Sequence, residues 1–435
     1  MLDWSQVKIS EGAVADARAL GLSGDIETKL RQMMTNSTPF SHPRGNRRFS
    51  KVMLLIKNGV LQSISPIDVD PRLREKQLRR AQRRRSLHQH VPSGDSPRPD
   101  DDTYVDDLPD SERKPIRLDR FVSDDWSGVE MLTVAQPLPD GEDRVLTAKD
   151  TEVFRDRAIG CFIGLAIGDA LGAPVEFEQP GTFDPVIGYR AGGPFNLRAG
   201  EWTDDTSMAL GLADALIEDP YLHTNLVMDN WLIWYKKGAY SHNGQCFDIG
   251  NQTRSALSDY AKGRTPPRTE SAGNGGIMRL APVVTRWWFD RRICGDISAR
   301  QSNRTHNNPE CEMAIVALSD LLCDLVAGNY RPENAPFLPS CPSTGWVKHT
   351  LTLVIESLRA GGTFTEMVLR VVNLGGDSDT AGAVMGMLAG SYHGLSGIPD
   401  ELVTSLAWSK RVLATAEKLA EAGLNAFKST RIAST

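Results

Sequence analysis

Gly160-Cys-Phe-Ile-Gly164-Leu-Ala-Ile-Gly168 places a glycine at every fourth position of an apolar stretch, and Gly172 and Glu176 continue the spacing. Residues four apart lie on one face of a helix, so these glycines leave that face almost without side chains. A helix with such a face can pack closely against a neighbour. The spacing by itself favours a packing role over a functional one.

The sequence around this stretch has helical periodicity from about residue 151 to residue 422. Glu310–Val326 is apolar over most of its surface, which predicts a buried helix. The same reasoning predicts helices at Trp346–Leu358, Phe364–Val372 and Leu402–Leu419. Strand signals are nearly absent, and Gly- and Pro-rich breaks separate the apolar segments. We therefore predict an all-α domain and place it at residues 149–425.

Residues 1–70 have a different pattern, which predicts a small α+β extension. Glu11–Leu20 and Asp25–Met34 have a helix-forming composition with apolar spacing. Two β-prone runs follow within residues 52–64, and the Asn58-Gly59 pair between them is typical of a type I′ hairpin turn.

Residues 71–148 are predicted to be a charged, poorly packed linker. Arg72–Arg85 carries eight basic residues against one Glu, and an acidic stretch that includes Asp100–Asp102 follows. The basic run is typical of a solvated helix or tether, and the alternative is a docking site for an acidic partner. Nucleic acid is the least favoured partner, because no aromatic residues alternate with the arginines to stack on bases.

Composition excludes several classes of protein. A net charge of −6 over 435 residues gives no general attraction to nucleic acid. The first residues lack the pattern of a secretory signal, and no run of about 18 uncharged apolar residues predicts a membrane span. The six cysteines are irregularly spaced without a Cys-x-x-Cys pair, which predicts reduced core thiols. We expect a cytoplasmic protein.

Two segments concentrate carboxylates and hydroxyls just before predicted helices. The first is Trp202-Thr-Asp-Asp-Thr-Ser207, before a helix at Met208–Ile217. The second is Asn373-Leu-Gly-Gly-Asp-Ser-Asp-Thr380, before a helix at Ala381–Gly390. Either segment alone is explained by helix capping, because Asp and Thr stabilise the positive end of a helix.

Together, the two segments predict a metal site. Their four carboxylates would repel one another in a shared pocket unless a cation neutralised them. Oxygen ligands without nearby His or Cys suit a hard cation such as Mg²⁺, Mn²⁺ or Ca²⁺. Gly375-Gly376 permits a tight turn, and the small residues of Ala381–Gly390 would let that helix pack closely and bring the segments together.

A glycine-rich segment, Ser271-Ala-Gly-Asn-Gly-Gly-Ile-Met-Arg279, has too many glycines for an ordinary helix start. Its composition predicts a loop whose backbone N–H groups cradle a phosphate, with Arg279 at its end.

These segments together resemble the ADP-ribosylglycohydrolase family over about residues 155–422. The matching motifs are, in order, Gly168-Asp-Ala-Leu-Gly with Glu176; Trp202-Thr-Asp-Asp-Thr; Phe247-Asp-Ile-Gly250 with Thr253; Asn274-Gly-Gly-Ile-Met-Arg279; Thr305-His306; and Asn373-Leu-Gly-Gly-Asp-Ser-Asp-Thr380. The Thr-Asp-Asp and Gly-Gly-Asp-x-Asp-Thr pair in this order is the most specific part of the match.

The resemblance implies an all-α orthogonal helical bundle with two Mg²⁺ ions, or Mn²⁺ in their place. It implies that the metal ligands are Thr203, Asp204, Asp205, Asp377, Asp379 and Thr380. In the family, the metals hold the ribose hydroxyls and orient the scissile bond.

The resemblance also implies the reaction and the residues around the substrate. Asp248 matches the carboxylate of arginine-directed members, which favours hydrolysis of the N-glycosidic bond between ADP-ribose and protein arginine. We assign general acid/base catalysis to Asp248, with Glu176 as the competing candidate and a helix cap as the structural alternative for Asp248. The predicted lining of the ADP-ribose groove is Asn274, Gly275, Gly276, Met278 and Gly376, with His306 as a ligand contact or a structural residue.

The extension has a separate predicted role. Some bacterial members with this layout are immunity proteins, in which the extension blocks an ADP-ribosyltransferase toxin while the hydrolase reverses its modification. The hypothesis is that residues 1–70, with Arg72–Arg85, bind such a toxin. The alternatives to the hydrolase are a non-catalytic ADP-ribose reader and another two-metal hydrolase, for example of phosphoesters.

Overall fold

The computed structural model describes the backbone of five short strands within residues 8–66 and residues 148–432 except residue 339. The chain divides into two compact units, Met1–Pro99 and Asp100–Thr435, and each is described here by itself. The predicted helices at 11–20 and 25–34, the turn at 58–59 and the linker up to residue 147 lie outside the described residues.

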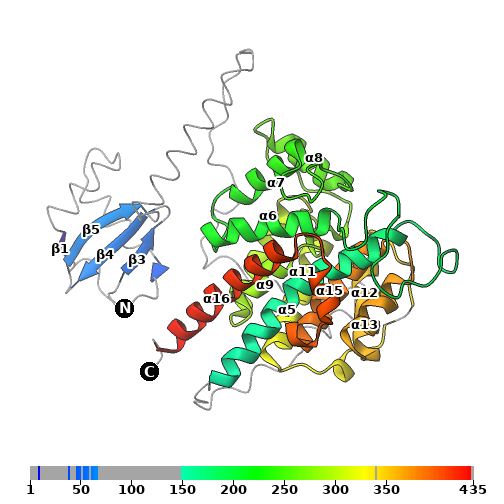
Figure 1. The fold of residues 1–435 in the computed structure, drawn as a ribbon. Coiled ribbons are helices and arrows are strands. Elements are labelled where there is room, and N and C mark those ends of the chain that lie inside the picture. The colour runs from blue at the N-terminus through cyan, green and yellow to red at the C-terminus, as the bar shows by residue number, and fades with distance from the viewer. Residues whose placement is uncertain are drawn as a thin grey trace. The chain divides into compact units, whose positions relative to one another are not determined.

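The N-terminal unit contains one five-stranded sheet in the order β1-β5-β4-β3-β2 (Figure 1). Its strands are β1 (Lys8–Ile9), β2 (Thr38–Pro39), β3 (Asn46–Phe49), β4 (Val52–Lys57) and β5 (Val60–Pro66). β4 and β5 pair antiparallel from Lys57 opposite Val60, as the predicted hairpin requires. β1 joins the far side of β5 in parallel.

The described part of the second unit is built from helices, with only two isolated β-bridges. The α-helices are α5 (Ala148–Gly172), α6 (Asp204–Glu218), α7 (Leu226–Lys237), α8 (Asn251–Tyr260), α9 (Ala281–Trp287), α10 (Arg291–Asn303), α11 (Pro309–Ala327), α12 (Val347–Ala360), α13 (Phe364–Val372), α14 (Ser378–His393), α15 (Asp400–Thr404) and α16 (Ser409–Ile432). Short 3-10 helices lie at Ala173–Val175, Asn274–Gly276, Pro332–Asn334 and Leu395–Gly397. The predicted all-α orthogonal bundle is confirmed.

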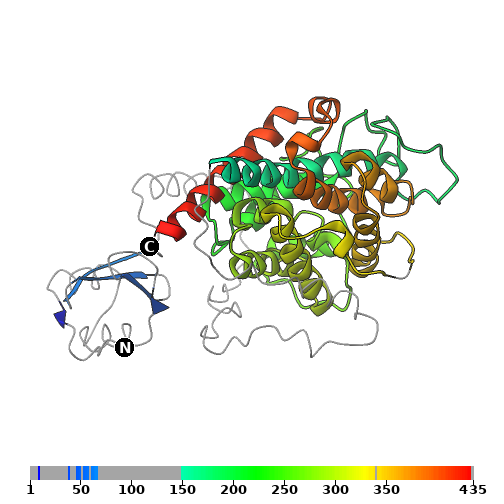
Figure 2. The same ribbon diagram turned by 90° about the horizontal axis from the view of Figure 1, so that it is seen from below.

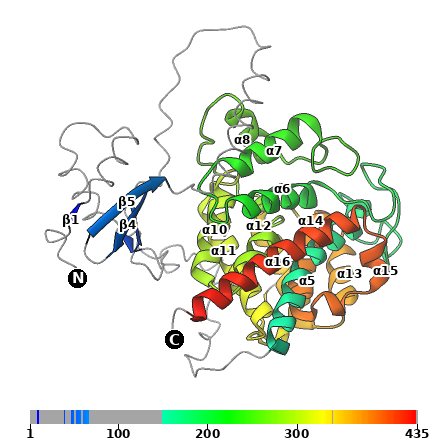
Figure 3. The same ribbon diagram turned by 60° about the vertical axis from the view of Figure 1, so that its left-hand side comes forward.

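α5 and α14 form an antiparallel pair at the centre of the bundle, and Figure 3 shows them next to each other with α16 alongside. Their glycines face each other along the contact. A Cβ atom on Gly164 would collide with the carbonyl oxygen of Gly386, and one on Gly168 would collide with that of Gly382. The two backbones therefore touch, as the four-residue glycine spacing predicted.

α5 is the central helix of the core. It is long and apolar enough, by length and composition, to cross a membrane, but its apolar window is entirely buried inside the domain. α9 and α16 cover other sides of it, and Figure 2 shows α16 in red crossing beside the teal α5. The sequence lacks an uncharged run of that length because Asp169 interrupts the helix.

Most predicted helices agree with the structure. α13 has the predicted bounds because a capping box of Thr363 and Glu366 fixes its first turn. The prediction of one helix at Leu402–Leu419 is wrong, because the chain leaves helical geometry between α15 and α16. There Ala407 bonds to the segment before α6: its N–H donates to Gly200 O at 2.8 Å, and its carbonyl accepts from Trp202 Nε1 at 2.9 Å.

The seam between α5 and α14 predicts a strong difference between two glycines. We expect Gly164→Ala to lower the free energy of unfolding by about 2 kcal/mol or more, because the new methyl group must push two backbones apart. Gly188→Ala is the matched control, since open space surrounds its Cβ position, and its effect should stay within about 0.5 kcal/mol. Thermal and denaturant unfolding measure both, and equal effects would contradict the packing described here.

Candidate metal centre and active site

The first acidic segment forms the start of α6. The helix begins at Asp204, so Asp204 and Asp205 lie in its first turn. The prediction placed both residues before the helix. Thr203 occupies the N-cap position, but its side chain caps no backbone N–H of its own helix. The capping explanation therefore does not account for this hydroxyl.

Asp169 of α5 caps α6 from outside. Its Oδ1 accepts hydrogen bonds from the Thr203 N–H at 2.9 Å and the Thr203 hydroxyl at 3.0 Å. Its Oδ2 accepts from the Thr206 N–H at 3.0 Å and the Thr206 hydroxyl at 2.7 Å. No role was predicted for Asp169. The available signal was a single carboxylate within the apolar residues 158–172 of α5, since a buried charge needs specific partners.

The second acidic segment surrounds the start of α14. Gly375 and Gly376 both have φ of +63°, and a Cβ atom on either would strike a backbone carbonyl of a neighbouring segment. Gly376 accepts a hydrogen bond from Phe177 N at 2.7 Å and donates its own N–H to Glu178 O at 2.8 Å. This turn therefore ties the start of α14 to the segment that follows Glu176.

The structure brings the two acidic segments together. The Thr203 hydroxyl lies 3.2 Å from Asp379 Oδ2, and the Thr380 hydroxyl donates to Asp205 Oδ1 at 3.4 Å. Oxygens of Asp204, Asp205 and Asp379 all lie within 4.8 Å of one another. α14 therefore contacts the first turn of α6 through the residues that the sequence analysis selected.

Glu176 and Asp248 complete a second group on the same centre. Their carboxylate oxygens lie within 4.8 Å of each other and of Asp379, which therefore belongs to both groups. Asp248 is a non-glycine residue at φ +58°, in the left-handed region. It caps no helix in the described structure, because Gly250 is the N-cap of α8 and no side chain caps that end.

The charges of this cluster are poorly compensated. Burial raises the pKa of Glu176 to about 11, with Asp379 as the next cause, and the same two causes raise the pKa of Asp248, Asp204 and Asp205. Four buried carboxylate oxygens have no hydrogen-bond partner in the described residues: Glu176 Oε2, Asp205 Oδ2, Asp248 Oδ2 and Asp379 Oδ1. Unsatisfied oxygens converging in this way fit a hard divalent cation.

Asp377 lies beside the cluster and is held by the glycine-rich loop. Its Oδ2 accepts from Asn274 Nδ2 at 2.5 Å, and the same amide also donates to Thr350 Oγ1 at 2.9 Å. Burial raises the pKa of Asp377 to about 7, with Asp379 as the next cause. Among the described residues, Asp377 is not part of either group of close oxygens.

The remaining predicted groove residues cluster around the short 3-10 turn at Asn274–Gly276. The buried ring of His306 packs against Gly275 so closely that a Cβ atom there would strike it, and its Nδ1 lies 2.8 Å from the Thr305 hydroxyl. Burial lowers the pKa of His306 to about 3, so the ring is neutral. Gly276 lies against Ser302, and Met278 is part of the core.

The prediction that Arg279 ends a phosphate cradle is wrong. Its guanidinium is completely buried, 4.0 Å from the centre of the Trp231 ring. It donates to Gln301 Oε1 at 2.8 Å and to Thr305 Oγ1 at 2.6 Å. Asp204 and Asp205 oppose the fall in its pKa that burial causes, so Arg279 is a buried cation beneath the cluster. Residue spacing alone could not indicate which way this side chain points.

Comparisons with known proteins agree with this geometry. A sequence model of the ADP-ribosylglycohydrolase family matches residues 150–340 and 329–428. Proteins named ADP-ribosylarginine hydrolase Tri1 from Pseudomonas putida and Serratia proteamaculans are 35% and 37% identical over 61% of this chain, and the matches cover 78% and 79% of their lengths. ADP-ribosyl-[dinitrogen reductase] glycohydrolase of Rhodospirillum rubrum is 30% identical over 58% of this chain and 90% of its own.

A solved structure also matches the helical domain. A chain from an ADP-ribosylglycohydrolase-related protein complex superposes with a TM-score of 0.55 and 33% identity, covering 62% of this chain and 99% of its own. Fold, site and relatives define a hydrolase that acts on glycosidic bonds. The chain belongs to the ADP-ribosylglycohydrolase family. The family uses a divalent metal centre, and the clustered acidic residues described above could hold one.

The hydrogen bonds of Asp169 predict that it supports metal binding without touching the metal. Asp169 is the acceptor in all four of its hydrogen bonds. An Asn side chain at this position would therefore place its NH₂ group against two of these donors. We expect Asp169→Asn to weaken Mn²⁺ binding roughly 10- to 100-fold in calorimetric titrations, because the first turn of α6 loses its anchor.

Asp214→Asn is the matched control for this titration. Asp214 lies further along α6, where its carboxylate accepts from Tyr240 at 3.1 Å, and its replacement should leave Mn²⁺ affinity unchanged. If Asp169→Asn lowers thermal stability but not Mn²⁺ affinity, Asp169 serves the fold alone and the expected support of the metal is refuted.

Proposed function

We propose that this protein hydrolyses the N-glycosidic bond between ADP-ribose and protein arginine, using two divalent ions that share Asp379. The observation that carries the proposal is the overlap of two groups of close carboxylate oxygens at that one residue, each with unsatisfied oxygens. The arginine linkage is supported by the relatives named ADP-ribosylarginine hydrolase and by the Asp248 motif.

The ligands divide between the two ions. Asp204, Asp205 and Asp379 would hold one ion, and the hydroxyls of Thr203 and Thr380 lie at the same place. Glu176, Asp248 and Asp379 surround the second position. Asp377 lies next to Asp379, which belongs to both groups of oxygens. Carboxylate and hydroxyl oxygens are ligands that suit Mg²⁺ or Mn²⁺.

The Thr203 hydroxyl shows how Asp169 prepares this site. A hydroxyl has one proton, and here Asp169 and Asp379 both accept within reach of it. Donation to Asp169 leaves a lone pair of the Thr203 oxygen free on the side of Asp379. Asp169 is therefore a positioning residue that orients a ligand and fixes the helix start that carries two more.

The reaction requires one proton to reach the leaving nitrogen. Hydrolysis breaks the bond between the anomeric carbon of ribose and the guanidino nitrogen; the carbon gains the hydroxyl of water and the nitrogen gains a proton. Divalent ions held by these carboxylates would orient the ribose hydroxyls beside the scissile bond. We assign the proton transfer to Asp248, because it matches the carboxylate of the Phe247-Asp-Ile-Gly250 motif and its buried Oδ2, beside the acidic cluster, has no hydrogen-bond partner in the described residues.

The assay that tests the proposal follows release of ADP-ribose in the presence of Mg²⁺ from two modified proteins. One carries ADP-ribose on arginine and the other carries it on serine. Release from the arginine substrate that stops on metal chelation is the expected result. Release only from the serine substrate would contradict the proposed arginine linkage. Release that continues after metal chelation would contradict the proposed role of the metal ions.

Two variants separate the candidate acids. We expect Asp248→Asn to lower kcat roughly 10²- to 10⁴-fold while ADP-ribose still binds, because the amide cannot supply the proton. Glu176→Gln should reduce turnover less at saturating metal, because the rest of the centre remains. Single-turnover release with calorimetric ADP-ribose binding distinguishes these cases, and a larger chemical defect in Glu176→Gln would transfer the acid role to Glu176.

We further propose that residues 1–70, together with Arg72–Arg85, bind a cognate ADP-ribosyltransferase toxin, so that the protein acts as an immunity factor. Three features support this. The N-terminal residues form a separate compact unit, the family match begins only at residue 150, and Arg72–Arg85 offers charge to an acidic partner surface. None of these is needed for the hydrolase chemistry derived above. Such a protein would act in the compartment of the toxin's target, which we expect to be the cytoplasm.

Removal of residues 1–147 should separate the two activities. The shortened protein should release ADP-ribose at a rate within about twofold of the full chain, because the catalytic groups all lie beyond residue 168. It should fail to capture the product of a neighbouring transferase gene in a pull-down. Equal capture by both forms would exclude the extension as the docking part.

A further inference from the structure

A second polar hollow lies at the opposite end of the α5–α14 pair from the metal centre. It has a volume of about 370 Å³ and is lined by Arg157, Leu325, Gly328, Tyr330, Arg331, Tyr392 and His393. Arg157 lies twelve residues before Asp169 on α5, which places the two about 18 Å apart along the helix. The hollow is therefore separate from the catalytic site.

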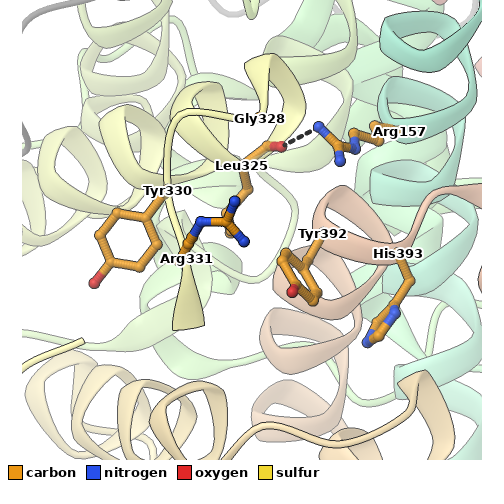
Figure 4. A pocket seen from close by; sticks show the side chains of 7 residues that line it. All are labelled: Arg157, Leu325, Gly328, Tyr330, Arg331, Tyr392 and His393. Atoms are coloured by element: carbon orange, nitrogen blue, oxygen red, sulfur yellow. Dashed lines mark hydrogen bonds between the residues drawn. The ribbon is translucent and has the colours of Figure 1, made fainter. Parts of the chain in front are cut away.

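Two arginines face this hollow from different elements. Figure 4 shows Arg157 coming from α5 on one side and Arg331, in the segment after α11, on the other, with the Tyr392 ring below them in this view. No carboxylate is among the lining residues. The nearby Asp156 is occupied elsewhere, because its two oxygens accept from the Ser396 N–H at 3.0 Å and the Ser396 hydroxyl at 2.8 Å.

The half-buried Arg157 has no ion-pair partner within the described residues. It makes one long hydrogen bond, from Nη1 to the Leu325 carbonyl at 3.5 Å. Burial lowers the pKa of its guanidinium, and the charges of Tyr392 and Asp156 oppose this fall only in part. Gly328 leaves room for it, because a Cβ atom there would come within 2.6 Å of Arg157 Nη1.

A purely structural role accounts for only part of Arg157. The C-terminal ends of α11 and α14 both border the hollow, and a cation there stabilises the negative end of a helix. Arg331 brings a second guanidinium to the same hollow, where Asp156 and the two helix ends supply the nearby negative charge. Arg331 lies at the open side, exposed and without an ion pair in the described part of the chain.

We propose that this hollow, the Arg157–Arg331 pocket, binds the phosphate group of a small molecule. A phosphate oxygen pair matches the planar donor fork of a guanidinium, and the N–H groups of Arg157 that do not face Leu325 remain available for it. The hydroxyl of Tyr392 adds a donor, and its ring offers a face for a base or sugar. The ligand is therefore a phosphate-bearing metabolite, or inorganic phosphate itself.

His393 lines the same hollow as a neutral ring. Its Nε2 lies 2.9 Å from the Gly362 carbonyl, and burial lowers the pKa of the ring. His393 therefore adds no positive charge at neutral pH, and recognition depends on the two arginines.

Calorimetric titration of the full chain without divalent metal tests the proposal, because a phosphate probe then has no metal ion to bind in the catalytic site. Inorganic phosphate is the first probe and AMP is the second, since tighter binding of AMP would identify a nucleotide ligand and equal binding a bare phosphate. We expect Arg157→Gln and Arg331→Gln each to weaken binding about tenfold or more.

Arg155→Gln is the matched control, because Arg155 lies on the same helix but pairs with Glu417 outside the pocket, at 3.5 Å. It should bind both probes as the unaltered protein does. Arg331→Gln removes an exposed side chain, so its result stands even if Arg157→Gln lowers stability. Absence of binding of both probes up to about 10 mM, or binding that survives in Arg331→Gln, would overturn the proposal.

Discussion

The contact between the glycine faces of α5 and α14 is the constraint on which the rest of the molecule depends. Because Gly168 and Gly382 touch through their backbones, the end of α5 that carries Asp169 meets the start of α14 that carries Asp379. Larger residues along this seam would separate the helices and with them the two acidic segments. The packing of the core and the assembly of the site therefore have the same physical origin.

Burying these carboxylates close together costs free energy, and the protein alone offsets this cost only in part. Buried carboxylates repel one another, and the one guanidinium seen beneath them, that of Arg279, is held by Gln301 and Thr305 in the core. Several oxygens of the cluster have no partner in the described residues. A site of this kind is more stable with a cation than without one, so metal binding and folding stability are coupled.

Local signals explain what could be predicted from the sequence. α13 was predicted with its correct bounds because Thr363 and Glu366 cap it within one turn, and the glycine spacing predicted the close helix pair. The start of α6 was misplaced because Asp169, far away in sequence, caps it. The break before α16 depends on bonds of Ala407 to another segment, and the inward turn of Arg279 depends on packing. Contacts between residues far apart in the chain produce no periodic sequence pattern from which they could be predicted.

The sharing of Asp379 by two ions is tested most directly by a crystal structure of the Mn²⁺-soaked protein, with data collected at the manganese absorption edge. The account predicts two anomalous peaks, one beside Asp204 and Asp205 and one beside Glu176 and Asp248, with Asp379 in contact with both. A single peak that Asp379 does not contact, or no peak in the cluster at all, would contradict it.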